Sequence, residues 1–280
     1  MLAEFKHALR RSRGTVIGWS IGLAFYSLII AILFDTMTEL EGLEELLQSY
    51  PPELMAFFGD FTQSMTPSGY LDTWFFSYMT LFMGIFAVSA GANLVASDEE
   101  NGILDLLLAY PISRTAFISA RLLGFVVATI IILSAGWLSW VIPSGSTQLN
   151  LTWIELLWPF LSLFAVLLLF GTLALLMSML LPAARLAAML SGGLLVANFL
   201  LIGLANLNDN LEAVVKLTPL YYYQGGGAIS GLDWVWLAGL LVVSLLFIVA
   251  AWLLFQRREI RVGGERSWQL PAVRGLISKS

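Results

Sequence analysis

The sequence lacks several residues on which catalysis and metal binding commonly depend. It has no cysteine and a single histidine, His7, which excludes disulfides, thiolate nucleophiles, Cys-ligated metals, histidine triads and multi-histidine metal sites. It also has neither the Walker A pattern G-x-x-x-x-G-K-[ST] nor a glycine-rich dinucleotide motif, and no H-E-x-x-H motif. The chain is therefore not expected to be an enzyme or to bind a cofactor of its own.

Charged residues are scarce and unevenly placed. They make up 12% of the chain against 59% hydrophobic residues, whereas soluble domains carry about 25% charged residues. No Lys or Arg occurs between Arg13 and Arg114, although acidic residues gather there. This composition indicates an all-α membrane protein surrounded by the lipid bilayer, and no nucleic-acid partner is expected.

Six apolar runs are each long enough, at about 20 residues, to cross a bilayer as a helix. We place these spans at residues 14–34, 73–96, 122–142, 156–181, 186–205 and 234–255. Residues 1–13 have apolar positions on one face and basic ones beside it, which predicts a short interfacial helix. Short helices are also predicted outside the membrane, within residues 35–72. A five-span alternative stays open, in which one long segment is re-entrant.

The basic residues predict the orientation of the spans. If both termini are cytoplasmic, every Lys and Arg except Lys216 falls in a cytoplasmic segment, including a basic tail at residues 256–280. Cytoplasmic segments of membrane proteins carry such an excess of Lys and Arg. We therefore expect a multi-pass protein of the plasma membrane, with both termini inside and residues 35–72 and 206–233 outside.

The connection between the second and third spans, Ser97 to Arg121, differs from a passive loop. Asp98 to Glu100 provide carboxylates suited to a helix start. Pro111 ends the predicted helix, and Ser113 can cap the next one. The apolar face of the helix before Pro111 recurs at helical spacing through Ile103, Leu104, Leu107 and Leu108. Such an amphipathic helix either lies in the lipid headgroups or receives a push from another protein.

Small and polar residues inside the spans suggest further roles. Gly14, Gly18 and Gly22 form a flat face that serves a dimer contact, intramolecular packing or no role. Asn93 and Asn198 either line a substrate pathway or hold two helices together. Ionisable residues are nearly absent from the span interiors, which disfavours a secondary transporter driven by ions or protons.

The segment EENGILDLLLAYPISR resembles the signature that follows the second span of ABC-2 type permeases, the membrane subunits of a class of ATP-driven exporters. Their acidic, glycine, leucine-rich and proline positions are matched, except that Ile103 stands where the family usually has Thr. The resemblance extends to the order of spans and to Tyr50–Asp60 and Leu217–Tyr223. The matching residues are Glu99, Glu100, Gly102, Leu104, Leu106, Leu107, Leu108, Pro111, Ser113 and Arg114.

This resemblance implies a single permease domain, without an ATPase domain, over residues 1–280. Two permease chains, identical or homologous, would engage two cytoplasmic ATPases that bind ATP and Mg²⁺. The predicted amphipathic helix between the second and third spans would be the coupling helix, which contacts the ATPase. It and the residues around it would contribute Glu99, Glu100, Gly102, Leu104, Leu107, Pro111 and Arg114 to that contact. An outer lid would contain Pro51, Phe57, Phe58, Pro219 and Tyr221. The alternative is a non-transport scaffold or assembly factor with the same fold.

Overall fold

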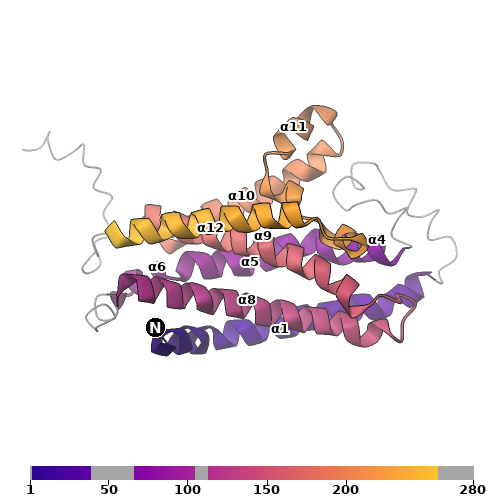
Figure 1. The fold of residues 1–280 in the computed structure, drawn as a ribbon, viewed down its shortest axis with the longest axis horizontal. Helices are drawn as coiled ribbons and strands as arrows, with labels where there is room; N and C mark the ends of the chain where they lie inside the picture. Colours follow the sequence, from indigo (N-terminus) through magenta and orange to yellow (C-terminus); the bar gives the residue numbers. More distant parts are fainter. Residues whose placement is uncertain (1, 39–65, 105–112, 258–280) are drawn as a thin grey trace, which may run out of the picture.

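The computed structural model describes residues 2–38, 66–104 and 113–257, and this part of the chain is helical with short connections (Figure 1). Within it, six helices are long and apolar enough to cross a membrane. Figure 1 shows them running side by side along the longest axis of the molecule. The prediction of an all-α protein with six candidate spans is confirmed. The six are α1 (Leu2–Thr38), the segment Pro67–Asn93, α8 (Arg114–Ser144), α9 (Trp153–Leu180), α10 (Ala184–Ala205) and α12 (Trp234–Arg257).

The first helix is longer than predicted and includes the N-terminal basic segment. Residues 1–13 were expected to form a separate interfacial helix, but α1 continues without a break from Leu2 through Gly14 to Thr38. The segment contains no proline, and a single glycine inside a helix costs only about 1 kcal/mol relative to alanine. The basic residues therefore occupy the first turns of the same helix that forms the first candidate span.

The second candidate span also begins earlier than residue 73. The Thr66 side chain accepts a hydrogen bond from the Gly69 amide, and Pro67 takes the first helical position. Both features favour a helix start. The span consists of α4 (Pro67–Leu71), a π-helical turn η2 (Asp72–Phe76) and α5 (Ser77–Asn93). The short helices predicted upstream lie largely in residues 39–65, outside the described residues.

Two groups of helices make up the bundle. Helix α1 packs along α8, while α9 packs against α5, α10 and α12, and the contact of α8 with α9 joins the two groups (Figure 1). Aromatic rings fill the core near η2. Phe75 meets Phe76 edge-on at 4.9 Å between ring centroids and Trp140 at 5.3 Å, and Phe76 meets Phe160 at 5.3 Å.

Helices α5 and α9 approach each other closely at two glycines that the sequence analysis did not single out. A Cβ atom on Gly91 of α5 would lie 2.0 Å from the backbone oxygen of Gly171 in α9. By contrast, a Cβ atom on Gly14, Gly18 or Gly22 would have nothing within 4 Å among the described residues. The glycine face of α1 therefore does not pack against any other part of the chain that the structure describes.

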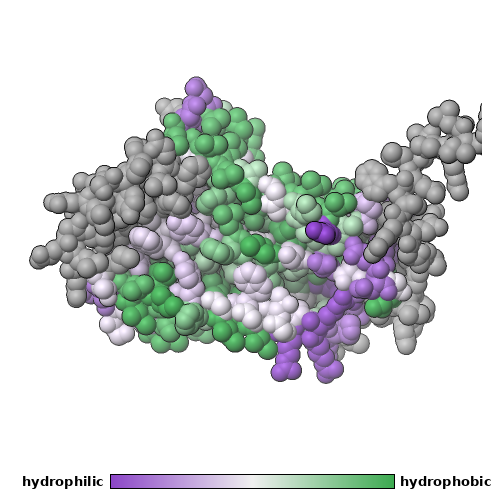
Figure 2. Space-filling model, turned by 180° about the vertical axis from the view of Figure 1, so that it is seen from behind, coloured by the Kyte–Doolittle hydropathy of each residue, from purple (hydrophilic) through white to green (hydrophobic). Residues whose placement is uncertain are grey.

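The outer surface of the bundle is largely apolar. Helices α1, α10 and α12 carry many of the exposed large hydrophobic side chains, such as Phe25 on α1, Met189 on α10 and Val235 on α12. Figure 2 shows hydrophobic residues over the middle of the molecule, with hydrophilic residues gathered near the start of α1. Such a surface suits lipid contact or another membrane-embedded chain.

Candidate functional site

One end of the bundle combines charge, burial and a sharp chain reversal. We call it the α6 end, after the short helix α6 (Ala96–Glu100) that lies there (Figure 1). Helices α1, α8 and α10 begin at this end, and α5, α9 and α12 finish there. The opposite end, which we call the α11 end, carries α11 (Glu212–Val215).

Asp98 and Glu99 lie in the first turn of a helix, as predicted, but that helix is short. Asp98, Glu99 and Glu100 lie within the five-residue helix α6, and the chain then turns at Gly102. Gly102 has φ +66°, a left-handed conformation that glycine adopts most readily. The Ile103 amide donates to the Asp98 carbonyl at 2.9 Å and closes the turn. Leu107 and Pro111 of the predicted coupling helix lie outside the described residues.

A buried network of ion pairs joins three helices at this end. Asp98, Arg121 and Glu4 come from α6, α8 and α1, and their side chains are 2%, 4% and 7% exposed. Arg121 Nε donates to Glu4 Oε1 at 2.8 Å, and Arg121 Nη2 lies 2.6 Å from Asp98 Oδ2. Arg11 of α1 pairs with the other oxygen of Asp98.

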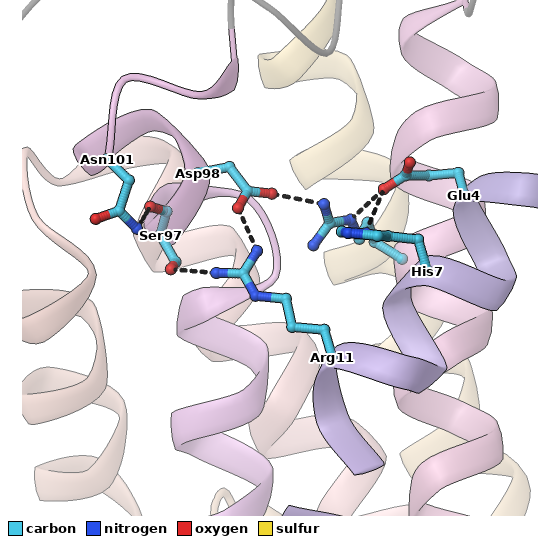
Figure 3. Close-up of polar contacts among 7 residues, drawn as sticks. Glu4, His7, Arg11, Ser97, Asp98 and Asn101 are labelled. Carbon is cyan, nitrogen blue, oxygen red and sulfur yellow. Dashed lines mark hydrogen bonds and ion pairs between the residues drawn. The ribbon is translucent and has the colours of Figure 1, made fainter. Parts of the chain in front are cut away.

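Weaker contacts surround this network (Figure 3). Arg11 Nη2 also donates to Ser97 Oγ at 2.9 Å. His7 Nδ1 lies 4.0 Å from Glu4 Oε1. Figure 3 shows Glu4, His7 and Arg11 on one helix, with Arg11 reaching towards Ser97 and Asp98. A buried carboxylate that loses its partner is strongly destabilising, so α6 cannot leave α1 and α8 without cost.

The network was missed by the sequence analysis, which counted Arg121 only as a base that predicts topology. The sequence nevertheless contained an indication of this network. Glu4 and Arg121 each lie among apolar residues, and Asp98 follows the small, apolar stretch Val95–Ser97. A charged residue on an otherwise apolar face of a helix is commonly paired when it is buried.

Two predicted coupling residues are engaged inside the chain. Glu100 Oε1 accepts a hydrogen bond from the Ala184 amide at 2.7 Å and so caps the start of α10. Leu104 is 3% exposed and packs in a cluster with Phe117, Met179 and Phe255. Substitution of Leu104 would therefore act on the stability of this chain before it acted on any docking.

The exposed part of the connection is its turn. Asn101, Gly102 and Ile103 are exposed, and the Ile103 side chain presents an apolar surface there. Glu99 is half-buried beside them. Asn101, Gly102 and Ile103 form the tip of the connection, and a second protein can contact them there.

Arg114 links the connection to the last span. Its Nη1 donates to the carbonyls of Phe255 at 3.0 Å and Gln256 at 3.2 Å, at the end of α12. A cation at a helix C-terminus satisfies free carbonyls and complements the helix dipole. Ser113 caps the start of α8 by accepting from the Ala116 amide at 3.2 Å, as predicted.

The two asparagines occupy different places. Asn93 is exposed on α5, donates to the Ser89 carbonyl at 2.8 Å and lines a pocket of about 330 Å³ between α1, α5 and α8. Asn198 on α10 donates to the Leu194 carbonyl at 2.8 Å and is not among the residues that line this pocket. The hydrogen bond that each side-chain amide donates to a carbonyl stays within its own helix.

The α11 end contains the second cluster of polar contacts. Asp72 in η2 accepts from the Gly226 amide at 2.7 Å, and a Cβ on Gly226 would lie 2.6 Å from the Asp72 amide nitrogen. Tyr223 OH donates to the Phe76 carbonyl at 3.1 Å, and Tyr26 OH donates to the Trp74 carbonyl at 2.8 Å. Two carbonyls of the π-helical turn thus obtain partners from Tyr223 and from α1, while the Asp72 side chain binds the amide of Gly226 in η5 (Gly225–Ser230).

Part of the predicted lid lies beside this cluster. Pro219 begins the turn η4 (Pro219–Tyr222), and Tyr221 packs against Trp236 of α12 at 5.6 Å between ring centroids. Pro51, Phe57 and Phe58 lie outside the described residues.

At the same end Lys216 forms an ion pair with Glu212 at 2.6 Å, and the hydrogen bond from the Lys216 ammonium lowers the pKa of that carboxyl.

One short segment matches the sequence motif of a catalytic site but lacks the structure that the motif requires. Residues 18–22 read Gly-Trp-Ser-Ile-Gly, which matches the nucleophile-elbow pattern G-x-S-x-G. That motif needs a strained turn between a strand and a helix, whereas these residues lie in the middle of α1. The match therefore carries no catalytic chemistry. In the ranges that the structure describes, no cluster of three or more His, Asp or Glu could hold a metal ion.

A family model described as "ABC-2 family transporter protein" matches residues 4–260, which is nearly the whole chain. The match includes all six candidate spans and the ion-pair network. No curated protein matches the chain.

Proposed function

The chain belongs to the ABC-2 family of transporter membrane proteins, and we propose that it is the permease subunit of an ATP-driven exporter. Membrane components of this family are typically non-catalytic permeases that work with ATPase partners. In our proposal, separate cytoplasmic subunits bind ATP and Mg²⁺, and a second permease chain, identical or homologous, completes the substrate pathway. Asn93 and Asn198 are candidates for lining that pathway.

The observation that carries the proposal is the way in which α6 is held. Asp98 is bound to Arg121 of α8 and Arg11 of α1, while Glu100 caps α10. A force on the tip at Asn101–Ile103 would therefore reach three candidate spans through hydrogen bonds and ion pairs, of which the pair of Asp98 with Arg121 is buried. An ATPase that binds this tip differently in its open and closed states would shift the permease between two conformations.

The predicted coupling residues then divide into two groups. Gly102 shapes the exposed tip, and Ile103 and Glu99 offer contacts beside it. Glu100, Leu104 and Arg114 transmit the movement, since they join the connection to α10, to the core and to α12. Leu107 and Pro111 complete the proposed docking segment.

The distribution of charge supports an orientation with the α6 end in the cytoplasm. All described Lys and Arg except Lys216 lie at that end, on the first turns of α1, in α8, at the start of α10 and at the end of α12. The positive-inside rule then places the N-terminus and the end of α12 inside. The exposed glycine face of α1 is available to the second permease chain.

The decisive experiment measures whether the tip holds an ATPase. A tagged chain is purified in mild detergent from its native membranes, and retained ATPase activity is compared with that of Ile103→Asp. Losing an apolar contact of this size costs roughly 1.5–3 kcal/mol, so retention should fall about tenfold or more. Leu217→Asp is the matched control, because Leu217 is an exposed apolar residue at the α11 end.

Equal retention by wild type and Ile103→Asp would contradict docking at the tip. Equal loss with Leu217→Asp would show that the effect is not specific to the α6 end. A scaffold with this fold is distinguished from an exporter by a second readout, since only an exporter would show ATP hydrolysis stimulated by a transported substrate in reconstituted vesicles.

A further inference from the structure

A pocket of about 330 Å³ opens between α1, α5 and α8 in the half of the bundle nearest the α6 end. Its walls come from residues 8–19 of α1, 85–93 of α5 with the adjacent Leu94, and 121–128 of α8. Thr15, Ile85 and Ser89 line it and are exposed, so the pocket reaches the surface of the bundle beside α1 and α5. Because these helices are candidate spans, that surface faces the membrane interior.

The pocket changes in character along its length. Its deep part is aromatic, with Trp19 and Phe86 at 6.1 Å and Phe86 stacked on Phe125 at 6.2 Å between ring centroids. The part nearest the end of the bundle contains Arg11, Ser12, Asn93 and Arg121. An apolar floor with a polar, cationic rim is complementary to an amphipathic molecule with an anionic head.

The charge at the rim favours an anion. Both ionisable residues that line the pocket are arginines, while Glu4 and Asp98, which pair with them, are buried behind them. The Arg11 side chain is 42% exposed. Three more exposed bases, Lys6, Arg10 and Arg13, lie on the same turns of α1. The two carboxylates offset two of these charges, so the first turns of α1 still carry an excess of positive charge.

We infer that this pocket binds an anionic membrane lipid, with one acyl chain against Trp19, Phe86 and Phe125 and the phosphate beside Arg11. The volume is at the lower end of the roughly 300–1,000 Å³ of small-molecule sites, so it fits one chain, and the second chain stays in the bilayer. Basic pockets between membrane helices on the cytoplasmic side bind anionic lipid headgroups in the same way.

The test is native mass spectrometry of the purified chain in detergent, without any ATPase, titrated with dioleoyl phosphatidylglycerol or dioleoyl phosphatidylcholine. The first phosphatidylglycerol should bind about fivefold more tightly than phosphatidylcholine, the factor that one base near a membrane surface supplies. Arg11→Gln should remove this preference, whereas Arg11→Lys should keep most of it. If Arg11→Gln keeps the full preference, the assignment of the headgroup is wrong.

Filling the pocket tests the acyl-chain site separately. Ser89→Phe and Thr15→Phe place a ring in the pocket from opposite walls, and both positions are exposed, so the ring displaces no buried side chain. Each should lose the tight lipid. Ser134→Phe is the control, an exposed serine on α8 that does not line the pocket. If both filled variants bind phosphatidylglycerol like wild type, or if Ser134→Phe loses it too, the proposal is overturned. These outcomes leave the transport proposal untouched, because no ATPase or transport step is measured.

Discussion

At the scale of single residues, Asp98 holds α6 in place through contacts with both α1 and α8. It is buried and pairs with Arg121 and Arg11, so its carboxylate connects α6 to two spans at once. A buried ion network contributes little net stability compared with apolar residues of the same shape. The network here fixes the position of one short helix, α6, relative to two long ones, α1 and α8.

Asp98→Asn should destabilise the chain by roughly 3–5 kcal/mol, since Arg121 would keep its charge in a buried site with one partner lost. Thermal unfolding in detergent, followed by tryptophan fluorescence, measures this loss. Glu212→Gln is the control, because Glu212 also forms an ion pair with a base but is exposed; its melting temperature should stay close to that of wild type. A melting temperature for Asp98→Asn equal to that of the control would mean that the network is not coupled to folding.

A second residue-scale contrast concerns two kinds of glycine. Gly91 lies against the backbone of Gly171, whereas Gly14 faces open space in this chain. A methyl group at Gly91 would need α5 and α9 to move apart, because the atom it meets is backbone and not a flexible side chain.

Gly91→Ala should therefore lower the melting temperature, with a cost on the order of 1–3 kcal/mol for overpacking. Gly14→Ala should be neutral or raise it slightly, because alanine favours the helix by about 0.5–1 kcal/mol over glycine. The same detergent melting experiment reports both. The reverse order of the two variants would show that α5 and α9 do not meet as closely as the structure has them.

At the scale of elements, the sequence predicted what depends on local pattern. Six apolar runs gave six long helices, and Ser113 was correctly placed as a cap, because hydrophobic length and cap chemistry are written in neighbouring residues. The continuous helix predicted from Asp98 to Pro111 is interrupted: Asp98 and Glu99 do lie in the first turn of α6, but α6 ends at Glu100. Gly102, which was read as part of a continuing helix, instead adopts a left-handed turn that ends α6.

The contacts that build the candidate site could not be read in the same way. The first two spans separate Glu4 from Asp98 and Arg121, and no local pattern states that these residues meet. The same holds for Gly91 with Gly171 and for Asp72 with Gly226. Each contact depends on how helices are arranged in space, and a single sequence carries little information about that arrangement.

At the scale of the whole molecule, charge divides the two ends of the bundle. The α6 end carries the described bases other than Lys216, together with the ion-pair network, while the α11 end carries Asp72, Glu212 and Asp233. The transport proposal needs the α6 end in the cytoplasm, where an ATPase would reach Asn101–Ile103. The orientation is therefore the property of the whole chain on which the other functional claims depend.

Cysteine labelling can decide the orientation, because the chain has no cysteine of its own. Asn101→Cys and Leu217→Cys place single thiols at exposed positions at the α6 and α11 ends. With an impermeant maleimide, position 217 should be labelled in intact cells, and position 101 only after the membrane is opened. The cysteine-free parent gives the background. Labelling of position 101 from outside would reverse the topology, place the tip beyond the reach of a cytoplasmic ATPase and remove the physical basis of the exporter proposal.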